Sequence, residues 1–253
     1  MIKNKLKIND SKTEFIVFRS PQAKQDLSGL SISVGDSQIT SSTKVRDLGV
    51  FFDECLSFND HVSNICRTTH FHLRNIGRIR NLLTFDATAQ LIHALITTRL
   101  DSCNSILYNL PHCLINRLQR IQNQAARMLT RSRRRNHITP VLIKLHWLRV
   151  TDRIVFKLLV LTHKAVHGVA PLYLCDLIEL SVKCTTVRTR EAADALILRT
   201  PSVSKCCSDT FLLRSFSHAA PTLWNGLDFE TRSLPFSQFK IKVKTLLYLK
   251  YFE

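Results

Sequence analysis

The spacing of apolar residues between Asn59 and Thr130 constrains the fold of this chain most strongly. In two stretches, apolar side chains recur about every 3.6 residues, the period of an α-helix with one buried face. The sequence therefore predicts two amphipathic helices, from Asn59 to about Asn81 and from Pro111 to about Thr130. The buried faces are expected to comprise Val62, Ile65, Thr69, Leu73 and Ile76 in the first helix, and Leu114, Leu118, Ile121, Ala125 and Leu129 in the second.

The rest of the chain is expected to be mainly α-helical, with a small N-terminal β portion. Three β-rich runs separated by Ser, Gly and Asp predict strands at 13–18, 30–34 and 44–52. Asn59 and Thr84 are suited to cap the two helices that follow them. Residues 181–220 have little periodicity and are expected to be extended or loop. Further helices are expected at 85–107, from 139–140 to 146–147, at 151–167 and from Ser233 and Pro235 to about Tyr251, and one or two helical turns are expected within 171–180.

Positive charge gathers in the middle of the chain. The net charge is +17, and residues 59–150 hold 14 Lys and Arg against only three acidic residues, Asp60, Asp86 and Asp101. Solvated helix faces usually mix both signs, so this imbalance indicates an anionic partner, most simply nucleic acid. The helical wheel places Arg67, Arg74 and Arg78 in the first helix, and Arg120, Arg127 and Arg131 in the second, away from the apolar faces. Arg133, Arg134 and Arg135 lie in the arginine-rich linker that follows the second helix.

The motifs of several enzyme classes are absent from the sequence. No G-x-S-x-G, G-x-x-x-x-G-K or G-x-G-x-x-G occurs among the six glycines, and no two aspartates are adjacent. His163 and His167 have the spacing of two helical zinc ligands, as do Cys66 and His70, but neither pair has a third ligand at a typical spacing. These side chains are interpreted as packing or surface residues. Cys206, Cys207 and Cys184 also lack zinc-ribbon spacing, so no metal or cofactor is expected.

The cysteine pattern and the hydropathy indicate the compartment. Eight irregularly spaced cysteines without a C-x-x-C pair are typical of reduced, mostly buried thiols rather than a disulfide framework. The most apolar run, 154–161, contains Lys157 and is too short to span a bilayer. The first residues lack the apolar segment of a signal peptide. We therefore expect a cytoplasmic or nuclear protein without a membrane partner.

Several stretches in a consistent order resemble the C-terminal part of the reverse transcriptase of non-LTR retrotransposons, LINE elements of the Jockey and chicken-repeat type. LKINDSKTEFIVF (6–18) is similar to a conserved palm block, and KVRDLGVFFDECLSFNDHV (44–62) is similar to the primer-grip hairpin and the entry to the thumb. The similarity continues through 91–111, 118–130, 137–174, 220–227 (APTLWNGL) and 239–248 (FKIKVKTLLY). It thus covers nearly the whole chain.

The resemblance implies a division into an end of the palm (1–58), a thumb-like helical region (59–136) and a C-terminal region (137–253). Polymerases of this family hold two magnesium ions with aspartates, two of which lie in a Y/F-x-D-D turn just before the block that opens this chain. The chain is therefore expected to lack polymerase activity of its own, and magnesium is expected only for an intact parent enzyme. The family pattern places a vestigial Lys12 near the nucleotide site. It matches Leu48, Gly49 and Val50 to the primer-grip turn.

The main hypothesis is a catalytically incomplete reverse-transcriptase relic that binds RNA or an RNA–DNA duplex by the backbone, without sequence preference. Two alternatives stay open at this level. The chain could be a co-opted scaffold that binds a protein partner through residues 137–253. It could also be a non-functional pseudogene product, whose unpaired N-terminal strand edges would favour aggregation.

Overall fold

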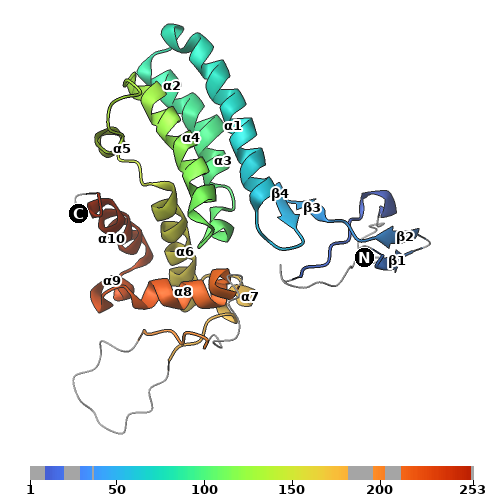
Figure 1. Cartoon of the computed structure of the whole chain (residues 1–253). Coiled ribbons are helices and arrows are strands. Elements are labelled where there is room, and N and C mark those ends of the chain that lie inside the picture. Colours follow the sequence, from blue (N-terminus) through green and yellow to red (C-terminus); the bar gives the residue numbers. More distant parts are fainter. Residues whose placement is uncertain (1–8, 20–28, 36, 182–195, 203–211, 252–253) are drawn as a thin grey trace, which may run out of the picture. The chain divides into compact units, whose positions relative to one another are not determined.

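The computed structural model describes residues 9–19, 29–35, 37–181, 196–202 and 212–251. The chain divides into two compact units, residues 1–64 and residues 65–253. It is mainly helical, with two small antiparallel β-hairpins near its N-terminus, as the sequence predicts (Figure 1). Among the described residues, no helix has both the length and the apolar character that a membrane crossing requires. The expected boundaries at 58/59 and 136/137 stay a prediction.

The N-terminal unit holds both hairpins. Strand β1 (Ser31–Val34) pairs with β2 (Ser37–Thr40), and β3 (Lys44–Asp47) pairs with β4 (Val50–Asp53). The run 44–52, which its composition suggests is one strand, is thus two strands joined by a two-residue turn. Leu48 and Gly49 both have positive φ, 45° and 89°, as a type I′ turn requires. The residue composition of 44–52 does not mark this turn.

Two other expectations for this unit are wrong. The predicted strand 13–18 is reduced to a single parallel bridge between Phe15 and Ser41, so its β-rich composition does not give it a paired strand. Asn59 is the first residue of helix α1 (Asn59–Ile79) rather than its cap. The Asp53 carboxylate instead accepts hydrogen bonds from the backbone N–H groups of Ser57 and Phe58, each at 2.8 Å. This contact joins the end of β4 to the start of α1.

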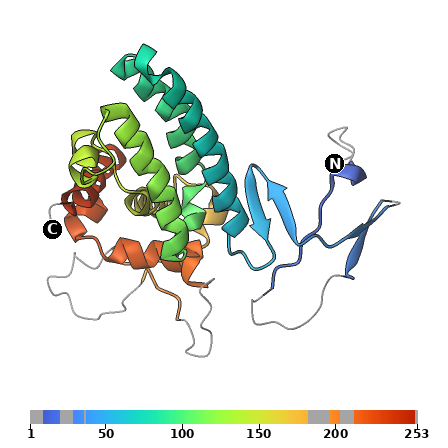
Figure 2. The same ribbon diagram turned by 45° about the horizontal axis from the view of Figure 1, so that its top comes forward.

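The apolar faces of the two amphipathic helices are confirmed. Helix α4 spans His112–Thr130, and it runs beside α1 in both views of the ribbon (Figures 1 and 2). All ten residues predicted to be buried in α1 and α4 are buried. A Cβ placed on Gly77 of α1 would lie 3.5 Å from the Met128 Cε, so the long Met128 side chain of α4 reaches toward α1 at this point. Periodicity alone was sufficient to identify these faces.

The expected helix at 85–107 is interrupted. Thr84 caps α2 (Phe85–Ile92) as predicted, accepting a hydrogen bond from the Ala87 N–H, but a π-helical turn follows at His93–Thr97 before α3 (Thr98–Asp101). Cys103 then adopts a left-handed conformation that ends the regular helix, and a 3-10 turn covers Asn104–Leu107. A second 3-10 turn, Arg80–Leu82, lies between α1 and α2. A wide helical turn and a left-handed residue leave the apolar period intact, so the sequence does not reveal them.

The C-terminal half forms a second core in the same unit as α4. Helix α5 (Thr139–Lys144) leads to α6 (Val150–Val166), and α7 (Leu172–Cys175) is a single turn, in agreement with the one or two helical turns expected within 171–180. The expected loop of 181–220 is wrong at its end, because α8 covers Phe216–Asn225. Helix α9 (Phe229–Ser233) was not predicted either, and it places Ser233 before the last helix, α10 (Phe236–Leu249). Residues 182–195 and 203–211 of the expected loop lie outside the described residues.

This second core is built around aromatic rings. Leu148, Leu159, Leu198, Trp224, Phe239, Val243 and Leu247 form one buried cluster. His163 lies at its edge, with its ring centroid 4.3 Å from that of Phe239 and 4.2 Å from that of His167. Its Nε2 lies 2.9 Å from the Leu234 carbonyl oxygen, a hydrogen bond in which the ring nitrogen donates. His163 is therefore a packing residue of the core, as the sequence analysis interpreted it.

We expect acid to destabilise this core through His163. Burial, and secondarily the charge of His167, lower the pKa of His163 below its ordinary value of 6.5, although its hydrogen bond to Leu234 acts in the opposite direction. The folded state thus favours the neutral ring, so stability is present above about pH 6.5 and is lost as the pH falls below it. Urea midpoints measured at about pH 7.5 and about pH 5 should fall on acidification. His163→Gln keeps a donor to Leu234 and should reduce the pH dependence; an unchanged or rising midpoint in the unsubstituted protein would contradict the expectation.

Candidate nucleic-acid interface

A groove of about 1010 Å³ lies between α1 and α4, within the C-terminal unit. Its walls come from residues 70–81 of the first helix and the turn after it, from 120–128 of α4, and from 131–134 beyond the end of α4. Six arginines are among the described residues that line it, and none of those residues is acidic. The six are Arg74, Arg80, Arg120, Arg127, Arg131 and Arg134. We call this feature the α1–α4 groove.

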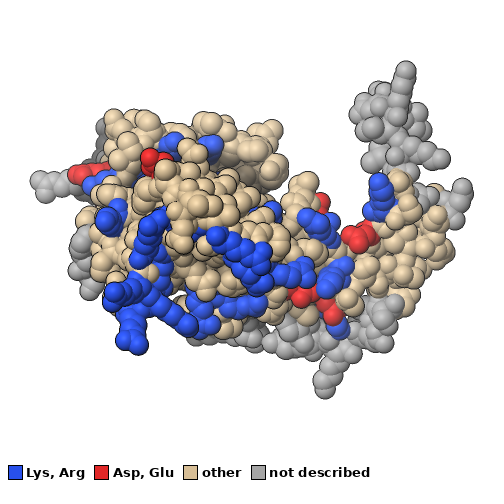
Figure 3. Space-filling view, turned by 90° about the horizontal axis from the view of Figure 1, so that it is seen from above, with Lys and Arg blue, Asp and Glu red and all other residues tan. Residues whose placement is uncertain are grey.

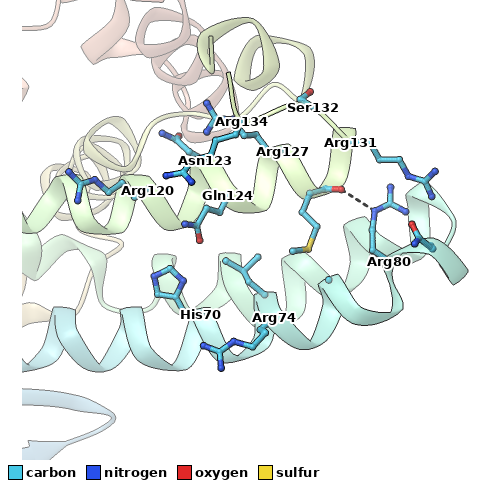
Figure 4. A pocket seen from close by; sticks show the side chains of 14 residues that line it. His70, Arg74, Arg80, Arg120, Asn123, Gln124, Arg127, Arg131, Ser132 and Arg134 are labelled. Atoms are coloured by element: carbon cyan, nitrogen blue, oxygen red, sulfur yellow. Dashed lines mark hydrogen bonds between the residues drawn. The ribbon is translucent and has the colours of Figure 1, made fainter. Parts of the chain in front are cut away.

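The groove brings together five of the arginines that the sequence analysis selected. Arg74 extends from α1, Arg120 and Arg127 extend from α4, and Arg131 and Arg134 follow the end of α4 (Figure 4). Within the described part of the chain, Arg74, Arg120, Arg131 and Arg134 form no ion pair. Lys and Arg side chains also gather in a band across the helical unit when it is seen from above (Figure 3). The positive potential of this surface is therefore not neutralised by partners within the described chain.

Four predicted arginines do not line the groove. Arg67 and Arg78 are exposed on α1, and Arg133 and Arg135 are exposed in the segment after α4. The helical wheel places Arg67 and Arg78 correctly on the polar side of α1, but it cannot distinguish the part of that side that faces a neighbouring helix. All four add to the charge around the groove without forming its walls.

Arg80 lines the groove and was missed by the sequence analysis. Its Nε donates a hydrogen bond to the Met128 carbonyl oxygen and its second terminal nitrogen donates to that of Leu129, both at 3.0 Å (Figure 4). The remaining terminal nitrogen donates to the Leu83 carbonyl oxygen, also at 3.0 Å. The carbonyl groups of Met128 and Leu129 lie near the C-terminal end of α4, where a helix carries partial negative charge and lacks internal donors. Arg80 thus joins the end of α1 to the end of α4.

Arg127 has one structural contact and one unused donor. A terminal nitrogen donates to the Asn136 carbonyl oxygen at 3.1 Å, which holds the arginine-rich segment 131–136 near α4. Its Nε is buried and has no hydrogen-bond partner among the described residues. A buried donor without a partner carries a free-energy cost that a bound acceptor would relieve.

Polar side chains other than arginine also line the groove, together with the apolar side chains of Leu73 and Met128. His70 of α1 and Asn123 and Gln124 of α4 lie between the arginines, and Gln124 points from α4 into the space beside α1 (Figure 4). The Asn123 amide oxygen accepts a hydrogen bond from Gln119 at 2.8 Å. The side-chain amide of Gln124 makes no hydrogen bond to the part of the chain that the structure describes. Each amide side chain presents both donors and an acceptor.

The predicted residues of the N-terminal unit have unequal access to a ligand. Leu48 is 93% exposed at the tip of the β3–β4 turn, next to the exposed Gly49. Val50 is 5% exposed, so it is buried and offers almost no surface to a ligand, unlike its two neighbours in the turn. Lys12 is exposed at the end of a single 3-10 turn, Asp10–Lys12.

The cysteines and histidines form no metal site in the described ranges, where no group of three or more His, Cys, Asp or Glu could hold an ion. Cys184, Cys206 and Cys207 lie outside those ranges. The expectation of mostly buried thiols is wrong for the others: only Cys66 is buried, while Cys103 and Cys113 are exposed. The latter two lie at a helix end and in the first turn of a helix, where apolar burial is incomplete. Burial raises the pKa of the Cys66 thiol, although Arg117 beside it acts in the opposite direction.

Comparisons of the chain with models of protein families, with curated proteins and with solved structures gave no match.

Proposed function

We propose that the chain binds RNA or an RNA–DNA hybrid through the α1–α4 groove, by the backbone and without sequence preference. The observation that carries this proposal is a groove with six arginines and no acidic residue in its lining. Guanidinium groups match phosphate oxygens in geometry and charge, and contacts to phosphate carry no base sequence information. The groove residues Arg74, Arg120, Arg131 and Arg134 are the principal phosphate contacts in this proposal.

The resemblance to the reverse transcriptases of non-LTR retrotransposons supports the same proposal from different residues. In that family the region similar to 59–130 is the thumb, which holds nucleic acid by its backbone. The β3–β4 hairpin with its Leu48–Gly49 turn has the form expected of a primer grip. We infer a relic of such an enzyme that binds nucleic acid and catalyses no polymerisation by itself.

Salt titration of the binding affinity tests this function. If the groove and its surroundings neutralise about five phosphates, the logarithm of the binding constant should fall with the logarithm of the salt concentration at a slope near −4, because each neutralised phosphate releases counterions. Fluorescence anisotropy with labelled RNA and RNA–DNA hybrids of unrelated sequence, between about 50 and 200 mM salt, gives this slope. Binding that is independent of salt, or no binding at about 50 mM salt, would overturn the proposal.

A further inference from the structure

The α1–α4 groove has two kinds of polar surface, which suit different parts of a nucleic acid. Arginines that form no ion pair with the described chain, among them Arg74, Arg120 and Arg131, offer contacts for phosphates. The imidazole of His70 and the amides of Asn123 and Gln124 lie between them in the groove lining. Phosphate binding alone requires only the arginines, so these other polar groups are available for a second kind of ligand contact.

Amide and imidazole side chains are suited to nucleic-acid bases. An amide presents donors and an acceptor that match the hydrogen-bonding edge of a base, and planar imidazole and guanidinium groups provide surfaces on which bases stack. Gln124 points into the groove and makes no hydrogen bond to the described chain. Its amide is thus available to a base that enters between the two helices.

Contacts between the walls of the groove restrict which bases can enter. A Cβ placed on Gly77 would lie 3.5 Å from the Met128 Cε, so the Met128 side chain reaches toward the α1 wall, and Arg80 holds the helix ends together. Within a duplex the hydrogen-bonding edges of the bases are paired and turned inward, so a duplex presents mainly its phosphates to such a surface. An unpaired strand can instead turn its bases outward into the groove. A site of about 1010 Å³ is at the upper end of the volumes that hold one small organic ligand, which suits a few nucleotides of one strand.

We propose that the α1–α4 groove binds a short unpaired strand, with its phosphates on Arg74, Arg120 and Arg131 and at least one base against Gln124. This inference rests on the proposed function and narrows its ligand from nucleic acid in general to the single-stranded form. The backbone of an unpaired strand is flexible enough to follow the arginines while its bases face inward. RNA and DNA strands share this chemistry, and the experiment includes both.

The test compares three probes of about 12 nucleotides or base pairs on the full chain at one salt concentration: single-stranded RNA, single-stranded DNA and their hybrid duplex. We expect at least one single strand to bind roughly tenfold more tightly than the duplex. Gln124→Leu keeps the size of the side chain and removes its hydrogen bonds. It should weaken binding of that strand by about tenfold and change duplex binding by less than about twofold. The matched control is Gln90→Leu on exposed Gln90 of α2, which does not line the groove and should change neither affinity.

The outcomes separate this inference from the proposed function. Duplex binding as tight as that of both single strands, or an equal loss on all probes in Gln124→Leu, overturns the single-strand inference and leaves backbone binding standing. Failure of every probe to bind at about 50 mM salt overturns the proposed function together with the inference.

Discussion

Replacing Arg74, Arg120, Arg131 and Arg134 together by glutamine should lower the affinity for nucleic acid roughly a thousandfold at low salt. Each arginine–phosphate contact contributes about 1 kcal/mol or more, so four lost contacts cost about 4 kcal/mol. The salt dependence should flatten at the same time, from a slope near −4 to about −1, because fewer counterions are released. Both quantities come from one set of anisotropy titrations. Arg80 and Arg127 are left unchanged because their hydrogen bonds hold the groove together.

A control variant distinguishes the groove from net charge. Lys144, Lys157, Lys242 and Lys244 are exposed and lie outside the groove lining, and changing all four to glutamine removes the same charge. This variant should lose far less affinity, on the order of tenfold, through the weaker long-range field. Equal losses in the two variants would show that total charge determines binding and would contradict an interface at the α1–α4 groove.

Trp224→Ala should reduce the free energy of unfolding by about 3–5 kcal/mol, the largest effect expected of a single substitution in this chain. The Trp224 side chain is fully buried, with ring centroids 5.7 Å from Phe239 and 6.0 Å from His163. Its Nε1 donates a hydrogen bond to the Leu196 carbonyl oxygen at 2.7 Å. Alanine leaves a cavity and removes this donor together. Urea denaturation measures the loss, which corresponds to a fall of roughly 10 °C in Tm.

Trp224→Phe separates the two contributions. Phenylalanine fills most of the site but donates no hydrogen bond, and Arg232 still donates to Leu196 at 3.4 Å. The expected loss is about 1–2 kcal/mol. A loss under about 1 kcal/mol in the alanine variant would show that α8 does not pack against α6 and α10 as described.

The sequence was sufficient for structure that depends on local spacing. The buried faces of α1 and α4 follow from the recurrence of Val62 to Ile76 and of Leu114 to Leu129, because any straight helix with that period places those side chains on one side. The Thr84 cap is also local, since its hydroxyl accepts a hydrogen bond within four positions. The arginines could be assigned to the polar sides for the same reason. The β3–β4 turn is local too, but the β-rich composition of 44–52 indicates one continuous strand, so the sequence pattern alone did not locate this turn.

Structure that depends on contacts between distant segments could not be predicted in this way. Arg80 donates hydrogen bonds to carbonyl groups 48 and 49 residues away, and no local sequence pattern distinguishes it from the other arginines. Helix α8 contains Pro221 in its interior, a residue that usually argues against a helix, and it follows a Ser- and Thr-rich stretch. Its stability comes from the burial of Ala219, Ala220 and Trp224 in a core formed with α6 and α10. Such packing is not visible in one stretch of sequence.

The three hydrogen bonds of Arg80 also affect the free energy and the rate with which the groove would bind the proposed ligand. Because two of them fix the ends of α1 and α4 against each other, the walls are already in place in the unbound protein. Such preorganisation spares a ligand the entropy of ordering the protein backbone, so the free energy of association is limited chiefly by the flexibility of the strand itself and of the arginine side chains. In the proposed binding of a strand to the groove, the association rate would therefore be set by the encounter of the two molecules and not by a conformational rearrangement of the helices.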